Sequence, residues 1–175
     1  MRLLPAIALS CLLLTVTETR ADVDQELFLG AYVSTLRNLP TRGVTGAYRI
    51  WLKAGADQGF SILYPRPFTL GCELRGGWLW GPDDTGEVSL LVDLKYELDL
   101  YDDFGFYLLI SGGGNYSGAS YESVPTHVNF IDRGSFGIRI YRVLLQASYE
   151  HRSNAGLDAP NRGVDLITAS VGYRF

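Results

Sequence analysis

Apolar and polar residues alternate along most of the chain, and this period of two is typical of β-strands. The carboxyl-terminal segment shows the pattern most clearly. Ile167, Ala169, Val171, Tyr173 and Phe175 fall on one face, while small or polar residues occupy the positions between them. Helical periodicity is hard to find anywhere in the sequence, so the pattern predicts an all-β protein.

The same alternation recurs in eight segments that are separated by turn-forming residues. We expect strands at residues 27–36, 45–54, 68–80, 87–100, 104–113, 127–140, 142–153 and 165–175. Outer-membrane barrels have even numbers of strands from eight upward, with apolar side chains toward lipid and polar ones toward the lumen. The 11 Tyr, 8 Phe and 3 Trp of the full chain can supply the aromatic girdles of such a barrel. The sequence therefore predicts an eight-stranded antiparallel transmembrane β-barrel of the outer-membrane type.

Connections in such a barrel alternate between short periplasmic turns and longer extracellular loops. The segment "YDDFG", residues 101–105, predicts a tight periplasmic turn. We expect the Gly/Ser-rich residues 111–123 and the loop that follows residue 153 on the extracellular side. Residues 55–67, which contain two prolines, are long for a periplasmic turn and fit this scheme poorly.

Residues 1–21 have the features of a secretory signal peptide, with Arg2 before an apolar run and small residues before a cleavage site. We expect cleavage after Ala21 and one barrel domain over residues 22–175. Removing Arg2, Glu18 and Arg20 from the totals of 15 basic and 19 acidic residues leaves 13 and 18, a net charge of about −5. This acidic balance argues against nucleic acid as a partner.

The residues that could bind a metal or form a disulfide are few. Cys72 is the one cysteine of the expected mature chain, so an internal disulfide is excluded. The two histidines, His127 and His151, show no metal-ligand spacing with it. We expect no metal and no other cofactor.

A group of polar residues interrupts the lipid-facing pattern near the carboxyl terminus. Counting by two along the seventh expected strand, His151 and Ser153 continue the outward face that begins with Val143, Leu145, Ala147 and Tyr149. Asp165 precedes Ile167 on the outward face of the last strand. If His151 lies opposite Asp165, the two strands pair without a bulge down to Val143 and Tyr173, and directly opposed Cβ atoms are ~5 Å apart.

The same counting predicts the depth of these side chains in the membrane. Asp165 precedes Phe175 by ten positions, which places it roughly 23 Å higher at ~3.3 Å per residue and ~45° tilt. The apolar band of an outer-membrane barrel is about 25 Å tall. We therefore expect His151, Ser153 and Asp165 at the outer edge of the hydrocarbon, facing lipid.

These three residue types can form a nucleophilic triad. A serine hydroxyl becomes a nucleophile when a histidine accepts its proton, and a carboxylate holds that histidine in the required tautomer. Ser153, His151 and Asp165 supply the three roles, which points to ester hydrolysis.

The loop after the seventh strand carries further candidates. Ester hydrolysis needs hydrogen-bond donors for the developing oxyanion, and we expect them from Asn154, Asn161 and the backbone around Gly156. Arg152 and Arg162 flank the three residues of the triad, and we expect them to attract anionic lipid headgroups.

The loop also carries a family resemblance. "HRSNAGLDAPNRGVD", residues 151–165, resembles the H-x-S-N-A-G-L-x-x-P-N-x-G-x-E signature of the PagL-type lipid A 3-O-deacylases. "NFIDRGSFG", residues 129–137, is similar to the family's N-F-x-D-R…G stretch. The resemblance is close over residues 127–175, and upstream only the strand pattern agrees.

This resemblance implies an outer-membrane serine esterase that removes the acyl chain at position 3 of lipid A without a metal. It implies His151 as base, Ser153 as nucleophile, and Asn154 and Asn161 near the oxyanion. Asp165 departs from the family, which has Glu at this position, so the carboxylate is one methylene shorter.

Two other functions remain open. One is a non-catalytic structural or adhesive outer-membrane barrel, and the other is an esterase that acts on phospholipid or on a different acyl chain. The expected partners are lipid A, as part of lipopolysaccharide, and the outer membrane, with a homodimer as an open alternative to a monomer.

Overall fold

The computed structural model describes residues 23–35, 41–52, 68–80, 84–118, 126–159 and 163–175. The expected signal peptide and residues 55–67 lie outside this part of the chain. The described residues form eight strands: β1 (Val23–Ser34), β2 (Arg42–Leu52), β3 (Phe68–Trp80), β4 (Thr85–Tyr101), β5 (Phe104–Ser117), β6 (Val128–Ile140), β7 (Val143–Ser153) and β8 (Val164–Arg174). No helix among these residues is long and apolar enough to span a bilayer.

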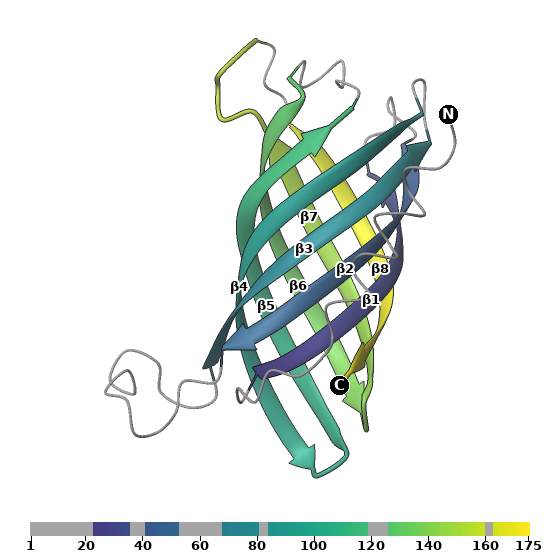
Figure 1. Cartoon of the computed structure of the whole chain (residues 1–175), viewed down its shortest axis with the longest axis vertical. Helices are drawn as coiled ribbons and strands as arrows, with labels where there is room; N and C mark the ends of the chain where they lie inside the picture. Colours follow the sequence, from purple (N-terminus) through teal and green to yellow (C-terminus); the bar gives the residue numbers. More distant parts are fainter. Residues whose placement is uncertain (1–22, 36–40, 53–67, 81–83, 119–125, 160–162) are drawn as a thin grey trace.

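Each strand pairs antiparallel with its neighbour in sequence, and β8 pairs with β1 to close the barrel (Figure 1). The predicted fold class and number of strands are confirmed. The tight turn predicted at 101–105 is also present, with residues 102 and 103 between β4 and β5.

The main difference from the predicted strands lies in β5. This strand continues to Ser117, so residues 111–117 belong to the barrel wall and not to an extracellular loop as expected. Three successive glycines at 112–114 erase the side-chain alternation by which a strand is recognised. Their backbones nevertheless pair with β4 on one side and β6 on the other.

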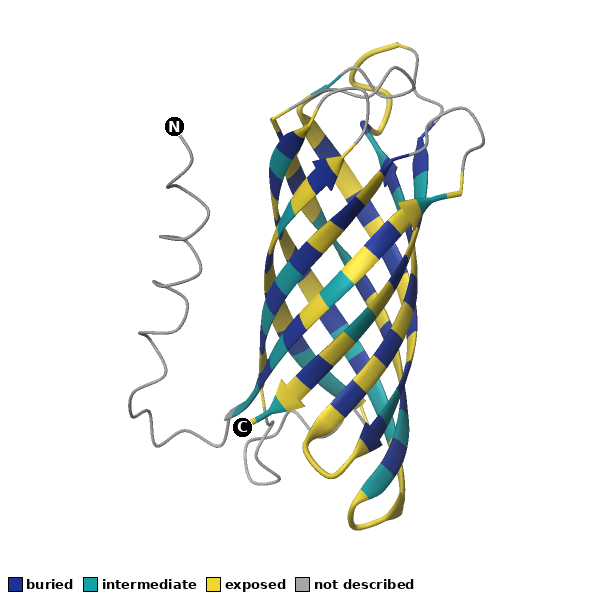
Figure 2. Cartoon of the chain, turned by 90° about the vertical axis from the view of Figure 1, so that its right-hand side faces the viewer, coloured by how far each residue is buried: buried dark blue, intermediate teal, exposed yellow. Residues whose placement is uncertain are grey.

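Buried and exposed residues alternate along the strands (Figure 2), because successive side chains point to the lumen and to the outer surface of the barrel. Large aliphatic side chains cover the outside, and Leu90 and Ile110 are 64% and 69% exposed. Charged side chains such as Arg49 and Glu73 are almost fully buried inside. This distribution is the reverse of that in a water-soluble protein and suits a barrel whose outer wall contacts hydrocarbon.

Aromatic rings in the lumen lie directly against glycines of neighbouring strands. A Cβ built on these glycines would come within 2.0–2.5 Å of a ring atom in each of four pairs: Phe28 with Gly172, Tyr32 with Gly43, Trp51 with Gly71, and Tyr107 with Gly137. The narrow lumen therefore accepts these rings because the facing strand position has no side chain.

Ion pairs fill the middle of the lumen. Arg133 donates to both carboxylate oxygens of Glu73 at 2.7 and 2.9 Å, and Arg49 Nε lies 2.5 Å from the same carboxylate. Arg49 belongs to β2, Glu73 to β3 and Arg133 to β6, so these contacts link β6 to two strands with which it does not pair.

The central position of Glu73 leads to a stability prediction. Glu73→Leu should lower the free energy of unfolding by about 3–5 kcal/mol, because two buried guanidinium groups lose a shared partner. The midpoint of urea unfolding in detergent, followed by heat-modifiable gel migration, measures this loss. Gly76→Ala is the control, since its new methyl group would point outward and meet one backbone atom at 3.9 Å. Equal midpoints for the two variants would show that the ion pairs contribute no net stability.

Candidate active site

The predicted pairing of β7 with β8 is present residue by residue. His151 lies opposite Asp165, and the pairing continues without a bulge down to Val143 opposite Tyr173. His151, Ser153 and Asp165 are half-buried and face outward, whereas the neighbouring Arg152 is buried inside the barrel. The strand alternation thus places the three candidate residues on the lipid-facing wall, close to the end of the barrel that carries the loop after β7.

A hydrogen bond joins two of these three side chains. His151 Nδ1 lies 2.7 Å from Asp165 Oδ1, with 43% and 29% of the two side chains exposed. An ionised carboxylate only accepts hydrogen bonds, so the imidazole donates from Nδ1 and keeps the lone pair of Nε2 available as a base. The aspartate therefore reaches the histidine in spite of its short side chain.

Ser153 completes the outward face of β7. It lies two residues beyond His151, roughly 6.5 Å along the strand, and pairs with Phe130 of β6. Within the described part of the chain, its hydroxyl makes no hydrogen bond. Catalytic hydrogen bonds are often long without substrate and shorten in the complex, so the geometry is compatible with a role as nucleophile.

Gly163 packs against the ring of His151. A Cβ built on this residue would lie 2.3 Å from Cε1 and 3.0 Å from Nε2, and its φ of +72° is a backbone conformation that favours glycine. Asp165, two residues later, binds the same ring at Nδ1. The start of β8 thus contacts the imidazole at two points.

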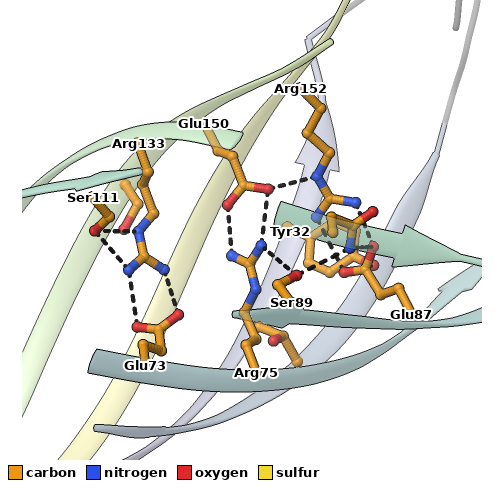
Figure 3. Close-up of polar contacts among 12 residues, drawn as sticks. Tyr32, Glu73, Arg75, Glu87, Ser89, Ser111, Arg133, Glu150 and Arg152 are labelled. Carbon is orange, nitrogen blue, oxygen red and sulfur yellow. Dashed lines mark hydrogen bonds and ion pairs between the residues drawn. The ribbon is translucent and has the colours of Figure 1, made fainter. Parts of the chain in front are cut away.

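Ion pairs inside the barrel fix the strand segment that carries the outward residues (Figure 3). Arg75 of β3 donates to both oxygens of Glu150 at 2.5 and 3.1 Å. Arg152 Nε donates to Glu150 at 2.6 Å, and its Nη2 donates to Glu87 of β4 at 3.1 Å. Because Glu150 and Arg152 bracket His151, these contacts hold its backbone from the lumen side.

This arrangement corrects the role that we expected for Arg152. Its guanidinium is 1% exposed and paired with two carboxylates in the lumen, so it does not face the lipid headgroups. Arg162 and Asn161, which were expected beside it, lie outside the described residues.

Asn154 and Gly156 shape the turn that follows β7. The amide of Asn154 donates to the carbonyl of Asp158 at 2.8 Å and accepts from the N–H of Gly156 at 3.0 Å. Leu157 N–H donates to the carbonyl of Asn154, and Ala155 and Gly156 have φ values of 52° and 81°, as in a type I′ turn. The polar groups that we expected at the oxyanion are therefore engaged within the loop in this structure.

Comparison with known proteins identifies the family of the chain. The sequence profile of the family described as lipid A 3-O-deacylase (PagL) matches residues 45–174. The chain belongs to this family. A search of curated proteins found no match.

Solved structures support the barrel fold at low sequence identity. The crystal structure of the outer membrane enzyme PagL superimposes with a TM-score of 0.63 at 16% identity, covering 86% of this chain and 98% of that one. Neisserial surface protein A gives 0.59 at 12% identity, with coverage of 87% and 95%. A designed transmembrane β-barrel gives 0.55 at 12% identity, with coverage of 90% and 99%. With the family match, these likenesses place the protein in the outer membrane as an eight-stranded barrel.

Two further residues beside the candidate site were not assigned from the sequence. Asp132 of β6 lies directly opposite His151 on the outer wall, so the imidazole has a carboxylate-bearing residue on each neighbouring strand. Tyr149 lies two residues before His151 on the same outward face of β7 and pairs with Ile167 of β8. Extending the strand register from β7 to β6 could have located Asp132, because the residue lies within the stretch that resembles the family.

The contact of Gly163 with His151 leads to a prediction about ring orientation. Gly163→Ala should leave the barrel folded but displace the imidazole and break its hydrogen bond to Asp165. The 15N chemical shifts of the imidazole, which report the tautomer, measure this change. Gly156→Ala is a matched control, because its φ of +81° imposes similar backbone strain while nothing lies within 4 Å of the new Cβ. Unchanged His151 shifts in both variants would contradict a positioning role for Gly163.

Proposed function

We propose that this protein hydrolyses the ester-linked acyl chain at position 3 of lipid A, in the outer leaflet of the outer membrane. The observation that carries the proposal is the hydrogen bond of 2.7 Å between His151 and Asp165 on the lipid-facing wall, with Ser153 on the same face. Membership of the lipid A 3-O-deacylase family supports the substrate, and the outward direction of the side chains supports a lipid as the source of the ester.

In the first half of the reaction, Ser153 Oγ attacks the ester carbonyl carbon while His151 Nε2 takes the hydroxyl proton. The carbonyl oxygen becomes an oxyanion in the tetrahedral intermediate. Collapse of this intermediate breaks the bond to the sugar oxygen, which leaves with the proton held by His151. Asp165 remains ionised throughout and stabilises the imidazolium.

In the second half, water attacks the acyl-serine with His151 again as base, and the fatty acid is released. Ser153 is the last residue of β7, so water can reach it from the loop while the acyl chain remains among the membrane lipids. For the oxyanion we retain Asn161 on the family resemblance, because the side-chain amide of Asn154 and the N–H of Gly156 are engaged in the turn.

The expected behaviour of nucleophile and base variants tests the mechanism. Ser153→Ala and His151→Ala should each lower turnover by at least about 10⁴-fold while the barrel folds normally. Mass spectrometry of lipid A from cells that produce each protein should show loss of one 3-hydroxyacyl unit from position 3 with the native protein and the control, and no loss with either variant. Cys72→Ala is the control, since Cys72 lies on the outer surface of β3.

The same spectra distinguish lipid A 3-O-deacylation from the two alternative functions. Loss of a different acyl chain would favour an esterase of other specificity, and unchanged lipid A in all cells would favour a non-catalytic barrel. A folded Ser153→Ala protein that removes the chain at the native rate would refute the mechanism.

Asp165 variants test the carboxylate. Asp165→Asn should lower turnover by about 10⁴-fold, because an amide can stabilise the wrong histidine tautomer. Asp165→Glu should also be slower than native, since the shorter carboxylate already hydrogen-bonds His151 at 2.7 Å and an added methylene must displace one of the two groups. Fatty acid release from lipopolysaccharide in detergent micelles measures both rates. A Glu variant that matches the native rate would indicate that the length of this side chain does not set the alignment.

A further inference from the structure

The outer wall of the barrel is almost free of charge. In the strands that the structure describes, the outward-facing positions carry apolar, aromatic or small residues with few exceptions. Four of these positions hold a residue with a carboxylate, guanidinium or imidazole: Arg42 on β2, Asp132 on β6, His151 on β7 and Asp165 on β8. Three of the four make up one row at the candidate active site, which leaves Arg42 to be explained.

Arg42 lies on the same side of the barrel as this row. It is the first residue of β2, is exposed, and pairs with Val33 of β1. Val33 in turn pairs with Ile167, which is two residues beyond Asp165 on β8. Two strand spacings of ~4.8 Å and two residues along a strand therefore separate Arg42 from Asp165, which is about 12 Å between backbones.

A neighbouring tryptophan indicates the level of Arg42 in the membrane. Trp80, the last residue of β3, pairs directly with Arg42 and is 39% exposed, with Trp78 on the same outward face. Tryptophan side chains at the ends of spanning segments lie at the headgroup level of the bilayer. The guanidinium beside Trp80 therefore lies where the polar heads of outer-leaflet lipids are found.

Arg42 also differs from the cations inside the barrel. Seven basic residues of the described strands point into the lumen, and each has a carboxylate partner: Arg49, Arg75, Lys95, Arg133, Arg139, Arg152 and Arg174. Arg42 has no ion pair within the described residues. Its charge is therefore available to a ligand, and a guanidinium is suited to phosphate because it can donate two parallel hydrogen bonds.

We propose that Arg42 binds a phosphate group on the headgroup of the same lipid molecule whose ester is placed at Ser153. This inference rests on the proposed function and extends it, because it assigns the binding of an anionic, phosphorylated sugar to a residue outside the triad. Ile167 pairs with Tyr149 of β7, and Ser153 follows Tyr149 by four residues. Three strand spacings and four residues along a strand, about 20 Å, therefore separate the backbones of Arg42 and Ser153. The arginine side chain covers part of this distance, and a phosphorylated disaccharide headgroup that carries the ester can span the remainder.

The test compares two substrates and three proteins in detergent micelles. The substrates are lipid A and the same lipid A after enzymatic removal of its phosphates, and the proteins are native, Arg42→Gln and Arg142→Gln. Arg142 is the matched control, since it is an exposed arginine in the turn at the opposite end of the barrel. For phosphorylated lipid A, Arg42→Gln should raise KM by about ten- to hundredfold at unchanged kcat, the usual effect of losing charged hydrogen bonds. For dephosphorylated lipid A, its KM should equal that of the native protein.

Other outcomes overturn the proposal. An equal loss on both substrates would mean that Arg42 supports the site geometry and not a phosphate. Unchanged KM values for both substrates, together with lost thermal stabilisation by added lipopolysaccharide, would mean that Arg42 binds a neighbouring lipid.

If the native protein releases no fatty acid, the proposed function fails separately, and the phosphate site is then tested by binding. Trp fluorescence of the Ser153→Ala protein, titrated with each lipid, should show tighter binding of the phosphorylated form only when Arg42 is present.

Discussion

Backbone N–H and C=O groups inside a bilayer have no water to bond, so they must bond one another. A closed sheet satisfies this demand only if all eight strands keep a common register, and here the pairing from β1 round to β8 and back to β1 is continuous. One irregularity occurs, between Asp99 and Tyr101 near the turn of β4 and β5. The position of every side chain, inward or outward, follows from this register. A shift of β8 by one residue would turn Asp165 toward the lumen and remove it from His151.

The register also connects the two faces of the wall. Along β7 the chain alternates between Glu150 inside, His151 outside, Arg152 inside and Ser153 outside. The inward residues are bound to β3 and β4 across the lumen, through Arg75 and Glu87 (Figure 3). Polar contacts inside the lumen thus fix the positions of His151 and Ser153 on the lipid-facing side of β7. A short, preorganised strand end is a better support for a catalytic group than a mobile loop.

Much of the fold and part of the site could be predicted from the sequence. The β7–β8 pairing was predictable because the alternation on both strands is unbroken, so His151 and Asp165 could be aligned by counting. The glycines at 112–114 concealed the end of β5, since a strand without side chains has no visible alternation. The ion pairs of Arg152 could not be predicted, because they depend on which strands face each other across the lumen. The contact of Arg75 with Glu150 depends on the same arrangement, which is not visible in the local sequence pattern. The turn formed by Asn154 and Gly156 was missed for a similar reason, because a side-chain amide near a serine predicts an oxyanion donor as readily as a turn.

The filled lumen has a consequence for permeability. The space bounded by Arg49, Glu73, Arg75 and Arg133 amounts to about 20 Å³, enough for roughly one water molecule. A gap of this size is too small for solutes larger than water, so this part of the lumen offers them no route. Any lipid that meets the outward-facing histidine must arrive sideways, by diffusion in the plane of the leaflet. The rate of encounter then depends on the surface density and lateral mobility of that lipid, and not on its concentration in the surrounding water.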